Sequence, residues 1–270
     1  MAVLRLSEIW IYPIKSLGGI RVKSAKVLEK GLQYDRRWML IDRDNEFMSQ
    51  RLYPKMALFK MQIESRWLLG SAFKITHGND SILLSCNHSF TGKQIKAAVW
   101  DDQVEVYEIG ERYSRWFSDH LGMECRLVSF PENNSRPVDK NYQVNQEQVS
   151  LADAYPFLII GEQSLVDLNS KLVEPVPMNR FRPNLVFSGG QPYEEDRWKN
   201  FSVGKNRFSA VKRCARCVLT TVNQETGEKG VEPLATLSTY RKHDNKVLFG
   251  QNVIAINHDK IQEGDEINLE

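Results

Sequence analysis

Two of the four cysteines, Cys214 and Cys217, lie three residues apart in a stretch rich in positive charge. The cations around them are Lys212, Arg213 and Arg216. Neighbouring cations stabilise a thiolate, the form of cysteine that attacks electrophiles and binds metals. The β-branched run at 218–222 favours a strand, so we expect the pair to stand just before a strand. A buried structural cysteine pair beside a solvated basic turn is the alternative.

A possible anion site lies near the N-terminus, where Lys15 and Ser16 precede Gly18 and Gly19. Lysine and serine side chains donate hydrogen bonds to phosphate, and glycines let backbone N–H groups approach it. The stretch is therefore a candidate phosphate contact. A plain glycine turn beside a surface lysine is the alternative.

Arginines precede two apolar runs. Arg36 and Arg37 come directly before the run at 38–41, and alternation along a strand points one of them to each side. An arginine that faces the interior needs an anionic partner, either the carboxylate of Asp35 or a ligand phosphate. Before a later run, three side chains at alternate positions share one side of an extended chain: Arg180, Arg182 and Asn184. For these three, a solvated edge is the alternative.

The composition is that of a soluble globular protein. Of 270 residues, 41% are hydrophobic and 26% charged, with a net charge of +2, so no global field points to nucleic acid or an anionic membrane. No apolar run approaches the roughly 18 residues of a membrane span, and the N-terminus lacks the layout of a signal peptide. Four cysteines in a chain this long do not form a disulfide scaffold. We therefore expect a reducing cytoplasm.

The elements that would position these residues are mostly short strands, with helices expected at 110–122, 164–172 and 233–241. The polar stretch 131–148 is typical of a linker or long surface loop, which divides the chain into domains at 1–130 and 131–270. We expect a mainly β (α+β) fold of barrel-like architecture rather than a doubly wound parallel sheet. Four scattered residues fit no metal template and are expected to be structural: His77, Asp80, Cys86 and His88.

Six motifs, in this order, resemble the MOSC-domain family, in the branch with an N-terminal MOSC β-barrel domain. They are Tyr-Pro-Ile-Lys-Ser-Leu-Gly-Gly, Gly-Leu-x-x-Asp-Arg-x-Trp-Met-Leu-Ile, Arg-Phe-Arg-Pro-Asn-Leu-Val, Arg-Cys-x-Arg-Cys-Val-Leu-Thr-Thr-Val, Glu-Pro-Leu-x-Thr-Leu-x-x-Tyr-Arg and Leu-Phe-Gly-Gln. That branch includes the mitochondrial amidoxime-reducing component and its bacterial relatives. The resemblance covers essentially the whole chain and implies an N-terminal β-barrel-like domain followed by a MOSC β-barrel domain with a few short helices.

The resemblance also implies the molybdenum cofactor, Mo-molybdopterin, and residues that hold it. The family motif places phosphate contacts at Lys15, Ser16 and Arg36, and pterin contacts at Asp153, Arg182 and Asn184. Thiolate is a soft ligand that suits the metal, and the family's ligand is the cysteine before Val-Leu-Thr-Thr, here Cys217. Arg216 beside it is counted among the cofactor-binding residues, whereas Cys214 is not a metal ligand in the family. Ala215 stands where many relatives carry a small hydroxyl residue, so a side-chain hydrogen bond there is lost.

The function that the resemblance implies is reduction of N-hydroxylated compounds, such as amidoximes and hydroxylamines. The four cysteines lack the spacing of a 2Fe–2S signature, so we expect electrons from a separate ferredoxin- or flavodoxin-type partner. The pyridoxal-phosphate sulfurase domain fused to other MOSC domains is not found, so activity independent of that cofactor is expected.

The first alternative is a carrier of molybdenum cofactor or sulfur without turnover. A thiol-redox or zinc protein using Cys214 and Cys217 is the next, although structural zinc needs four ligands and thioredoxin-like pairs open a helix. A wholly structural role would leave the motifs to coincidence.

Overall fold

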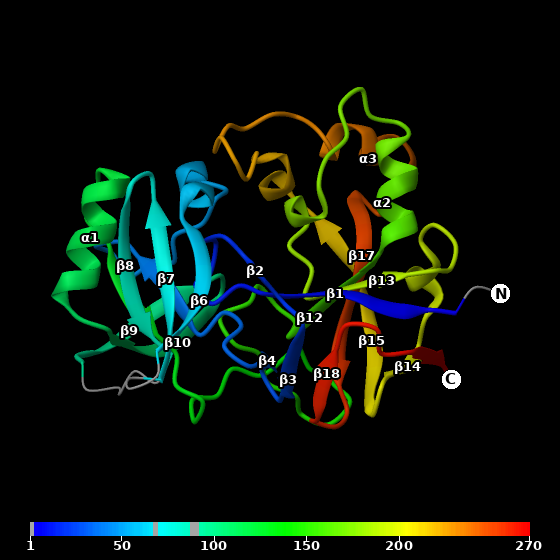
Figure 1. The fold of residues 1–270 in the computed structure, drawn as a ribbon, viewed down its shortest axis with the longest axis horizontal. Helices are drawn as coiled ribbons and strands as arrows, with labels where there is room; N and C mark the ends of the chain where they lie inside the picture. Colours follow the sequence, from blue (N-terminus) through cyan, green and yellow to red (C-terminus); the bar gives the residue numbers. More distant parts are fainter. Residues whose placement is uncertain (1–2, 67–69, 87–91) are drawn as a thin grey trace.

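The computed structural model describes residues 3–66, 70–86 and 92–270, arranged in two lobes that lie side by side in Figure 1. The predicted mainly β fold with a few short helices is confirmed. The helices are α1 (Glu111–Leu121), α2 (Glu162–Asn169) and α3 (Leu234–Tyr240). All three expected helices are therefore present within two to three residues of their predicted ends. No helix in the described part of the chain is long and apolar enough to cross a membrane.

The lobe that carries α1 is built on two antiparallel sheets. One sheet has the order β5-β11-β10-β9 and the other β6-β7-β8. Their bounds are β5 (Trp38–Ile41), β6 (Lys60–Arg66), β7 (Gly70–His77), β8 (Asp80–Ser85), β9 (Gln94–Val99), β10 (Asp102–Glu108) and β11 (Arg126–Ser129). Phe117 of α1 is fully buried in the main core, which confirms the apolar helical face expected from the sequence.

The second lobe is built on a large sheet that also contains the N-terminal strand. Its order is β19-β14-β15-β17-β12-β13-β1-β2, with β16 pairing with β17. The bounds are β1 (Arg5–Ile11), β2 (Ile20–Val22), β12 (Phe157–Gly161), β13 (Leu185–Ser188), β14 (Asn200–Val203), β15 (Asn206–Arg216), β16 (Lys242–His243), β17 (Lys246–Ala255) and β19 (Ile267–Leu269). Because β1 pairs antiparallel with β13, the chain starts in the second lobe and then crosses to the first. The division at 130/131 stays a prediction.

A small three-stranded sheet joins a segment near the N-terminus to one near the C-terminus. It has the order β18-β3-β4, where β3 is Ser24–Leu28, β4 is Gly31–Leu32 and β18 is Lys260–Gln262. The stretch 131–148 contains no named strand or helix, as its polar composition predicted, apart from an isolated bridge between Pro137 and Gln148. It is nevertheless not a plain surface loop, because Arg136 within it is buried.

The strand expected at 218–222 is wrong. Residues Val218–Thr221 form a short 3-10 helix, η4, and the cysteine pair instead ends β15, with Cys217 directly after its last residue. The hydroxyl groups of Thr220 and Thr221 donate to the carbonyl oxygens of Cys217 and Val218, at 2.9 and 2.8 Å. These local hydrogen bonds satisfy the backbone without a sheet partner, so they override the strand preference of β-branched residues.

Gly250 is required where β17 pairs with β15, the strand that contains Cys214. The pairing of β15 with β17 shifts register twice, once opposite Gly250, between Arg213 and Ala215. Gly250 has a φ of +80°, and an added Cβ would lie 2.6 Å from Cγ1 of Ile160. A bulge of this kind bends a strand and redirects its side chains. Here it redirects the end of β15 that carries the cysteines.

A buried carboxyl group holds the start of α2. Glu195, in the 3-10 helix η3 (Glu194–Arg197), is fully buried, and its carboxylate accepts hydrogen bonds from the Ser164 hydroxyl at 2.9 Å and the Gly161 N–H at 3.3 Å. Burial raises the pKa of Glu195 to about 7, although the hydrogen bonds favour the charged form. The folded protein therefore prefers this carboxyl neutral.

We predict that Glu195→Gln removes a pH dependence of stability. Between its unfolded pKa of 4.5 and its folded value near 7, the folded state binds the proton more tightly, so the free energy of unfolding falls as pH rises. The loss between pH 5 and pH 8 should be about 3 kcal/mol smaller in Glu195→Gln than in the wild type. Urea unfolding at both pH values measures it, with the exposed Glu174→Gln as control. An equal loss in all three proteins would contradict the prediction.

Candidate functional site

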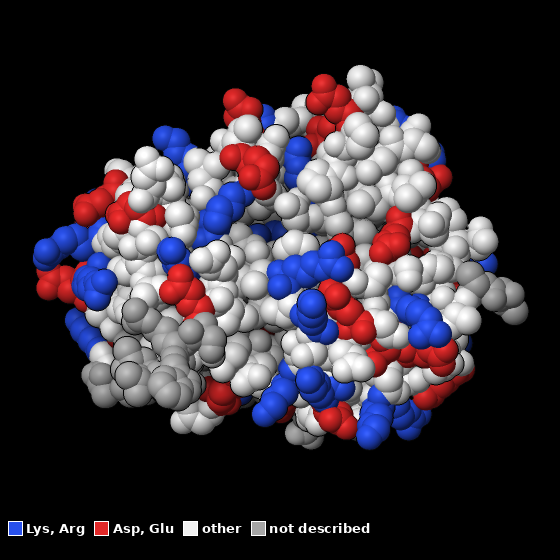
Figure 2. All heavy atoms as spheres, viewed as in Figure 1, with Lys and Arg blue, Asp and Glu red and all other residues white. Residues whose placement is uncertain are grey.

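The predicted site residues, which come from five separate stretches of the chain, line one cavity: Lys15, Ser16, Arg36, Asp153, Arg182, Asn184, Arg216 and Cys217. The space between these residues is about 790 Å³, a volume that includes open solvent at the mouth of the cavity. Figure 2 shows a hollow at the centre of the molecule, between the lobes, with lysine and arginine atoms in and around it. Their spatial grouping is a finding of the structure, while their roles remain predictions.

Lys15 lies at the floor of the cavity, with only 4% of its surface exposed. Its Nζ donates to the carbonyl oxygen of Leu151 at 2.8 Å and to Oδ1 of Asp153 at 2.5 Å. Burial lowers the pKa of Lys15 to about 8, and the Asp153 carboxylate opposes part of that change. The ammonium group is therefore still charged at neutral pH, in a place where a charge is costly unless it is paired.

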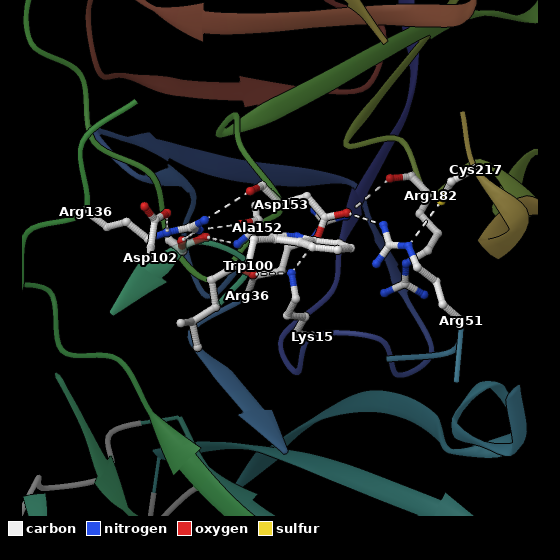
Figure 3. Close-up of polar contacts among 12 residues, drawn as sticks. Lys15, Arg36, Arg51, Trp100, Asp102, Arg136, Ala152, Asp153, Arg182 and Cys217 are labelled. Atoms are coloured by element: carbon white, nitrogen blue, oxygen red, sulfur yellow. Dashed lines mark hydrogen bonds and ion pairs between the residues drawn. The ribbon is translucent and has the colours of Figure 1, made fainter. Parts of the chain in front are cut away.

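Asp153 is the carboxylate that faces these cations, and 49% of its side chain is open to the cavity. Enclosure by the walls favours its neutral form, but Lys15 and Arg51 outweigh this and hold the pKa of Asp153 well below its usual range. Figure 3 shows Lys15 and Arg51 reaching Asp153 from two directions. The carboxylate is thus ionised at neutral pH.

The two arginines before β5 point to opposite sides as expected, but the reason is a turn with a φ of 49° at Arg36 and not the alternation of an extended strand. Arg36 lines the cavity and donates to Oδ2 of Asp35 at 2.6 Å and to Oδ1 of Asn184 at 3.1 Å. Arg37 turns away to Glu132, at 2.5 Å. Arg36 therefore has the carboxylate of Asp35 as its partner, and it also faces the cavity where a ligand would lie.

Arg182 is buried beside Arg36, and the two guanidinium groups lie 4.2 and 4.3 Å from the centre of the Tyr12 ring. One Arg182 nitrogen donates to the carbonyl oxygen of Leu17 at 2.7 Å. Burial lowers the pKa of Arg182 to about 10, so it too is charged at neutral pH. Stacking on an aromatic face stabilises such cations by the ring quadrupole.

The expected single extended face of Arg180, Arg182 and Asn184 is wrong. Arg180 belongs to the 3-10 helix η2 (Met178–Arg180) and donates to the carbonyl oxygen of Thr220 at 3.3 Å, outside the cavity lining. Arg182 has a φ of +54°, so the chain reverses direction there instead of alternating. Arg182 and Asn184 still reach the cavity, but by a turn and not by strand periodicity.

Three cavity residues that are not glycine adopt the left-handed backbone region: Ser16, Arg36 and Arg182, with φ of 66°, 49° and 54°. This conformation is uncommon for such residues and costs free energy, and it concentrates at binding and active sites. The glycines of the Lys15–Gly19 stretch, by contrast, are not among the residues that line the cavity. A Cβ on Gly18 would lie 2.7 Å from the Phe59 carbonyl oxygen, and one on Gly19 would lie 2.5 Å from the Tyr12 ring. The glycines are therefore needed for close packing within the protein, and their role at a phosphate stays a prediction.

Both cysteine sulfurs contact a guanidinium group. Arg51 Nε lies 3.2 Å from the Sγ of Cys217, and Arg216 Nη1 lies 3.0 Å from the Sγ of Cys214. The other Arg216 amino group donates to the Phe181 carbonyl oxygen at 2.7 Å, while its Nε is buried without a partner. An unpartnered buried donor in a cavity wall is a group that a bound acceptor would satisfy.

The geometry of Cys214 and Cys217 gives little support to the thiol-redox and zinc alternatives. From Cys214 to Cys217 the chain is extended, so their Cα atoms are about 10 Å apart at the usual rise of a strand. A disulfide needs Cα atoms within about 7 Å. Within residues 3–66, 70–86 and 92–270, no group of three or more histidine, cysteine or acidic side chains could hold a metal ion. Of the four residues expected to be structural, His88 lies outside the described residues.

Three residues of the site were missed by the sequence analysis. Arg51 bridges the Cys217 sulfur and Oδ2 of Asp153, the latter at 2.7 Å, and Trp100 donates to Oδ1 of Asp153 at 3.3 Å. Arg136 donates to the carbonyl oxygens of Ala152 and Asp153, at 2.5 and 3.0 Å. Each is a single residue in a turn or loop, and one arginine among 36 lysines and arginines gives no spacing signal.

Two family models match the chain and together cover most of its length. Residues 3–124 match the family described as the MOSC N-terminal beta barrel domain, and residues 146–268 match the MOSC domain. A molybdenum cofactor sulfurase of Oryza sativa subsp. japonica is 34% identical over 280 residues, which are 97% of this chain and 33% of that protein.

Two further relatives are similar over most of both chains. The mitochondrial amidoxime-reducing component 1 of Mus musculus is 34% identical over 282 residues, and that of Homo sapiens is 33% identical over 283 residues. Each alignment covers 98% of this chain and 82% of the relative. The chain thus spans about a third of the rice sulfurase and most of each amidoxime-reducing component.

We predict that Arg136→Met loosens the cavity wall from which Asp153 projects. Arg136 is 4% exposed and also donates to the Ser150 carbonyl oxygen and to Asp102. Loss of the guanidinium leaves several buried carbonyl oxygens without a donor, and each unpaired oxygen costs about 1–3 kcal/mol of stability. The free energy of unfolding should fall by about 3 kcal/mol or more, and amide hydrogen exchange at 150–153 should accelerate. Arg207→Met, which removes an exposed ion pair with Glu270, is the control and should cost under about 1 kcal/mol. Equal effects in the two variants would contradict the prediction.

Proposed function

The chain belongs to the MOSC-domain family, and from this premise we propose that it is an oxidoreductase that binds the molybdenum cofactor and reduces N-hydroxylated compounds, such as amidoximes and hydroxylamines. The observation that carries the proposal is the placement of Cys217 in the wall of a cavity whose charged side chains are mainly cations. Sulfur is the soft ligand, and cations are the phosphate contacts, that this cofactor requires.

The residues present fit such a group. Lys15, Arg36, Arg51, Arg182 and Arg216 line the cavity, whereas Asp153 is the acidic residue of its lining. Because Asp35 behind Arg36 supplies one further negative charge, the cavity keeps a surplus of positive charge that an anionic ligand would neutralise. The unpartnered Arg216 Nε and the three left-handed residues support a built binding site.

In this proposal each residue has a stated task. Lys15, Ser16 and Arg36 would hold the phosphate, and Asp153, Arg182 and Asn184 would hold the planar pterin by hydrogen bonds. Cys217 would ligate the metal, with Arg216 beside it. When bound, the cofactor supplies the two-electron chemistry that removes the oxygen of an N–OH group as water. Ala215 lines the cavity with no hydroxyl to contribute, so at that position only the backbone is left to donate.

The electrons would come from a separate ferredoxin- or flavodoxin-type protein. The relatives named above are described as components, a word that fits a system of more than one protein. The cytoplasm stays the predicted compartment, while relatives with mitochondrial names exist. The second candidate function is a carrier of molybdenum cofactor or sulfur, because one relative is a molybdenum cofactor sulfurase and the same residues would bind the cargo.

We predict that molybdenum binding depends on Cys217 and not on Cys214. Protein made in a host that synthesises the cofactor should contain close to one molybdenum per chain by elemental analysis. Cys217→Ala should lose most of it, because the thiolate ligand is gone. The matched control, Cys214→Ala, should retain it. Absence of molybdenum from all three proteins, in a host shown to load another molybdoenzyme, would contradict the proposal.

We predict turnover by the loaded wild-type protein with a chemical electron donor. With reduced methyl viologen and an aromatic amidoxime, the amidine should accumulate, as followed by liquid chromatography and mass spectrometry. Cys217→Ala should be slower by more than about 100-fold, since even outer-shell partners of a metal cost up to that factor. Full molybdenum content without amidine formation, on amidoximes and on hydroxylamines, would favour the carrier function instead.

A further inference from the structure

We propose that Arg51, a residue of the first lobe, positions the Cys217 sulfur and sets the positive charge around it, and that Trp100 holds the Arg51 guanidinium in place. The inference rests on the proposed function, in which Cys217 is the metal ligand. It adds a positioning residue that neither the sequence motifs nor the comparisons indicate.

The contacts of Arg51 join the two sides of the cavity. Its Nε lies 3.2 Å from the Cys217 sulfur, and its Nη2 lies 2.7 Å from Oδ2 of Asp153. Its side chain is 18% exposed, so water competes little for these donors. In Figure 3 the Arg51 side chain rises from below and places its guanidinium between Asp153 and Cys217. A planar guanidinium held at two points has a fixed orientation, and so has the sulfur that it contacts.

Trp100 covers the guanidinium from the turn between β9 and β10. The Arg51 Cζ lies 4.6 Å from the centre of the Trp100 ring, within the range of a cation–π contact. Trp100 has a φ of +58° and is 48% exposed. Turns of this kind usually place glycine, asparagine or aspartate there, and a tryptophan at the position costs free energy. Neither burial nor turn preference explains this residue, whereas its contacts do: the Phe47 ring, whose centre lies 5.0 Å from that of Trp100, together with Arg51 and Asp153.

The turn that carries Trp100 is itself attached to the Asp153 segment. Asp102, at the start of β10, pairs with Arg136 Nε at 2.8 Å, and Arg136 donates to the Asp153 carbonyl oxygen. Trp100 and Asp153 therefore keep their relative positions through a buried arginine. Figure 3 shows this chain of contacts from Arg136 to Cys217.

The backbone of Arg51 is fixed to the segment that follows Cys217. Lys229 donates to the Arg51 carbonyl oxygen. The neighbouring Gln50 is fully buried, exchanges side-chain hydrogen bonds with Gln224 at 3.2 and 2.9 Å, and donates to the Ser16 carbonyl oxygen at 2.8 Å. Buried amide pairs of this kind have a single satisfied arrangement. The backbone that carries the Arg51 side chain is thus held in place. An exposed ion pair on the surface would not require such support.

The test compares how fast Cys217 reacts with iodoacetate, which is an anion, and with iodoacetamide, which is neutral. Both reagents are attacked by the thiolate, so the ratio of the two rates does not depend on the ionised fraction of the sulfur. Cofactor-free protein is used, and trypsin cleavage after Arg216 separates Cys217 from Cys214 for mass spectrometry. Arg51→Met should lower the ratio roughly ten-fold, the effect of one positive charge at about 5 Å in partly solvated surroundings.

Matched variants make the result specific. Arg43→Met removes an exposed arginine of the same lobe, whose side chain is 79% exposed, and should leave the ratio unchanged. Arg51→Lys should retain most of the wild-type ratio, because it keeps the positive charge. Trp100→Leu should lower the ratio by an intermediate factor, and as an exposed turn residue it serves also where Arg51→Met fails to fold. An unchanged ratio in folded Arg51→Met or in Trp100→Leu would overturn the proposal, and so would an equal fall in Arg43→Met.

A second readout uses the loaded protein. If Arg51 acts on the ligand sulfur, redox titration of bound molybdenum should give a more negative reduction potential in Arg51→Met than in the wild type, because a hydrogen bond and a positive charge at the thiolate are lost. Arg51→Lys should lie between them. An unchanged reduction potential in Arg51→Met would overturn the proposed effect of Arg51 on the metal through its ligand sulfur. Because the alkylation ratio needs no metal, absence of molybdenum would refute the proposed function and leave the assignment of Arg51 to be decided by that ratio.

Discussion

The structure depends on keeping several cationic side chains together in a partly enclosed cavity that holds fewer carboxylates than cations. Each of Lys15, Arg36 and Arg182 donates to a backbone carbonyl oxygen as well as facing the cavity. Carbonyl oxygens orient a cation without neutralising it, so the charge stays available for a ligand. A set of complete ion pairs would have been easier to bury, but it would have left nothing for an anion to bind.

The path of the chain follows from this requirement. Both lobes must contribute, and the crossing of the chain after β1 places Lys15 and Ser16 where the lobes meet, with β1 anchored to β13 of the large sheet. The Asn184 backbone also accepts a hydrogen bond from Trp10. Two cavity segments far apart in sequence are therefore fixed by one sheet before any ligand binds. A site built in this way is preorganised, which reduces the entropy lost on binding.

Residue types alone pointed to the cationic thiol pair, to Lys15 and Ser16, and to the arginines before apolar runs, whereas Asp153 was predicted only from the family resemblance. What failed was local geometry. The threonines after Cys217 form hydrogen bonds within their own turn, which strand propensity does not register. The positive φ of Arg182 breaks the alternation on which a shared face depends. Arg51, Trp100 and Arg136 were missed because their importance lies in tertiary contacts with Asp153, more than 15 residues away in each case.

The extent of the cavity bears on whether the protein turns over a substrate or carries a cofactor. A carrier needs only the residues that hold its cargo. This cavity continues beyond them, along a wall formed by Cys214, Tyr155 and Asn252. Tyr155 brings an aromatic ring and Asn252 an amide, and such a mixture of apolar and hydrogen-bonding groups suits a small polar organic molecule. Lining residues to which the predicted cofactor contacts assign no role are a reason to favour the proposed turnover, because a second molecule must lie next to the metal for reduction to occur.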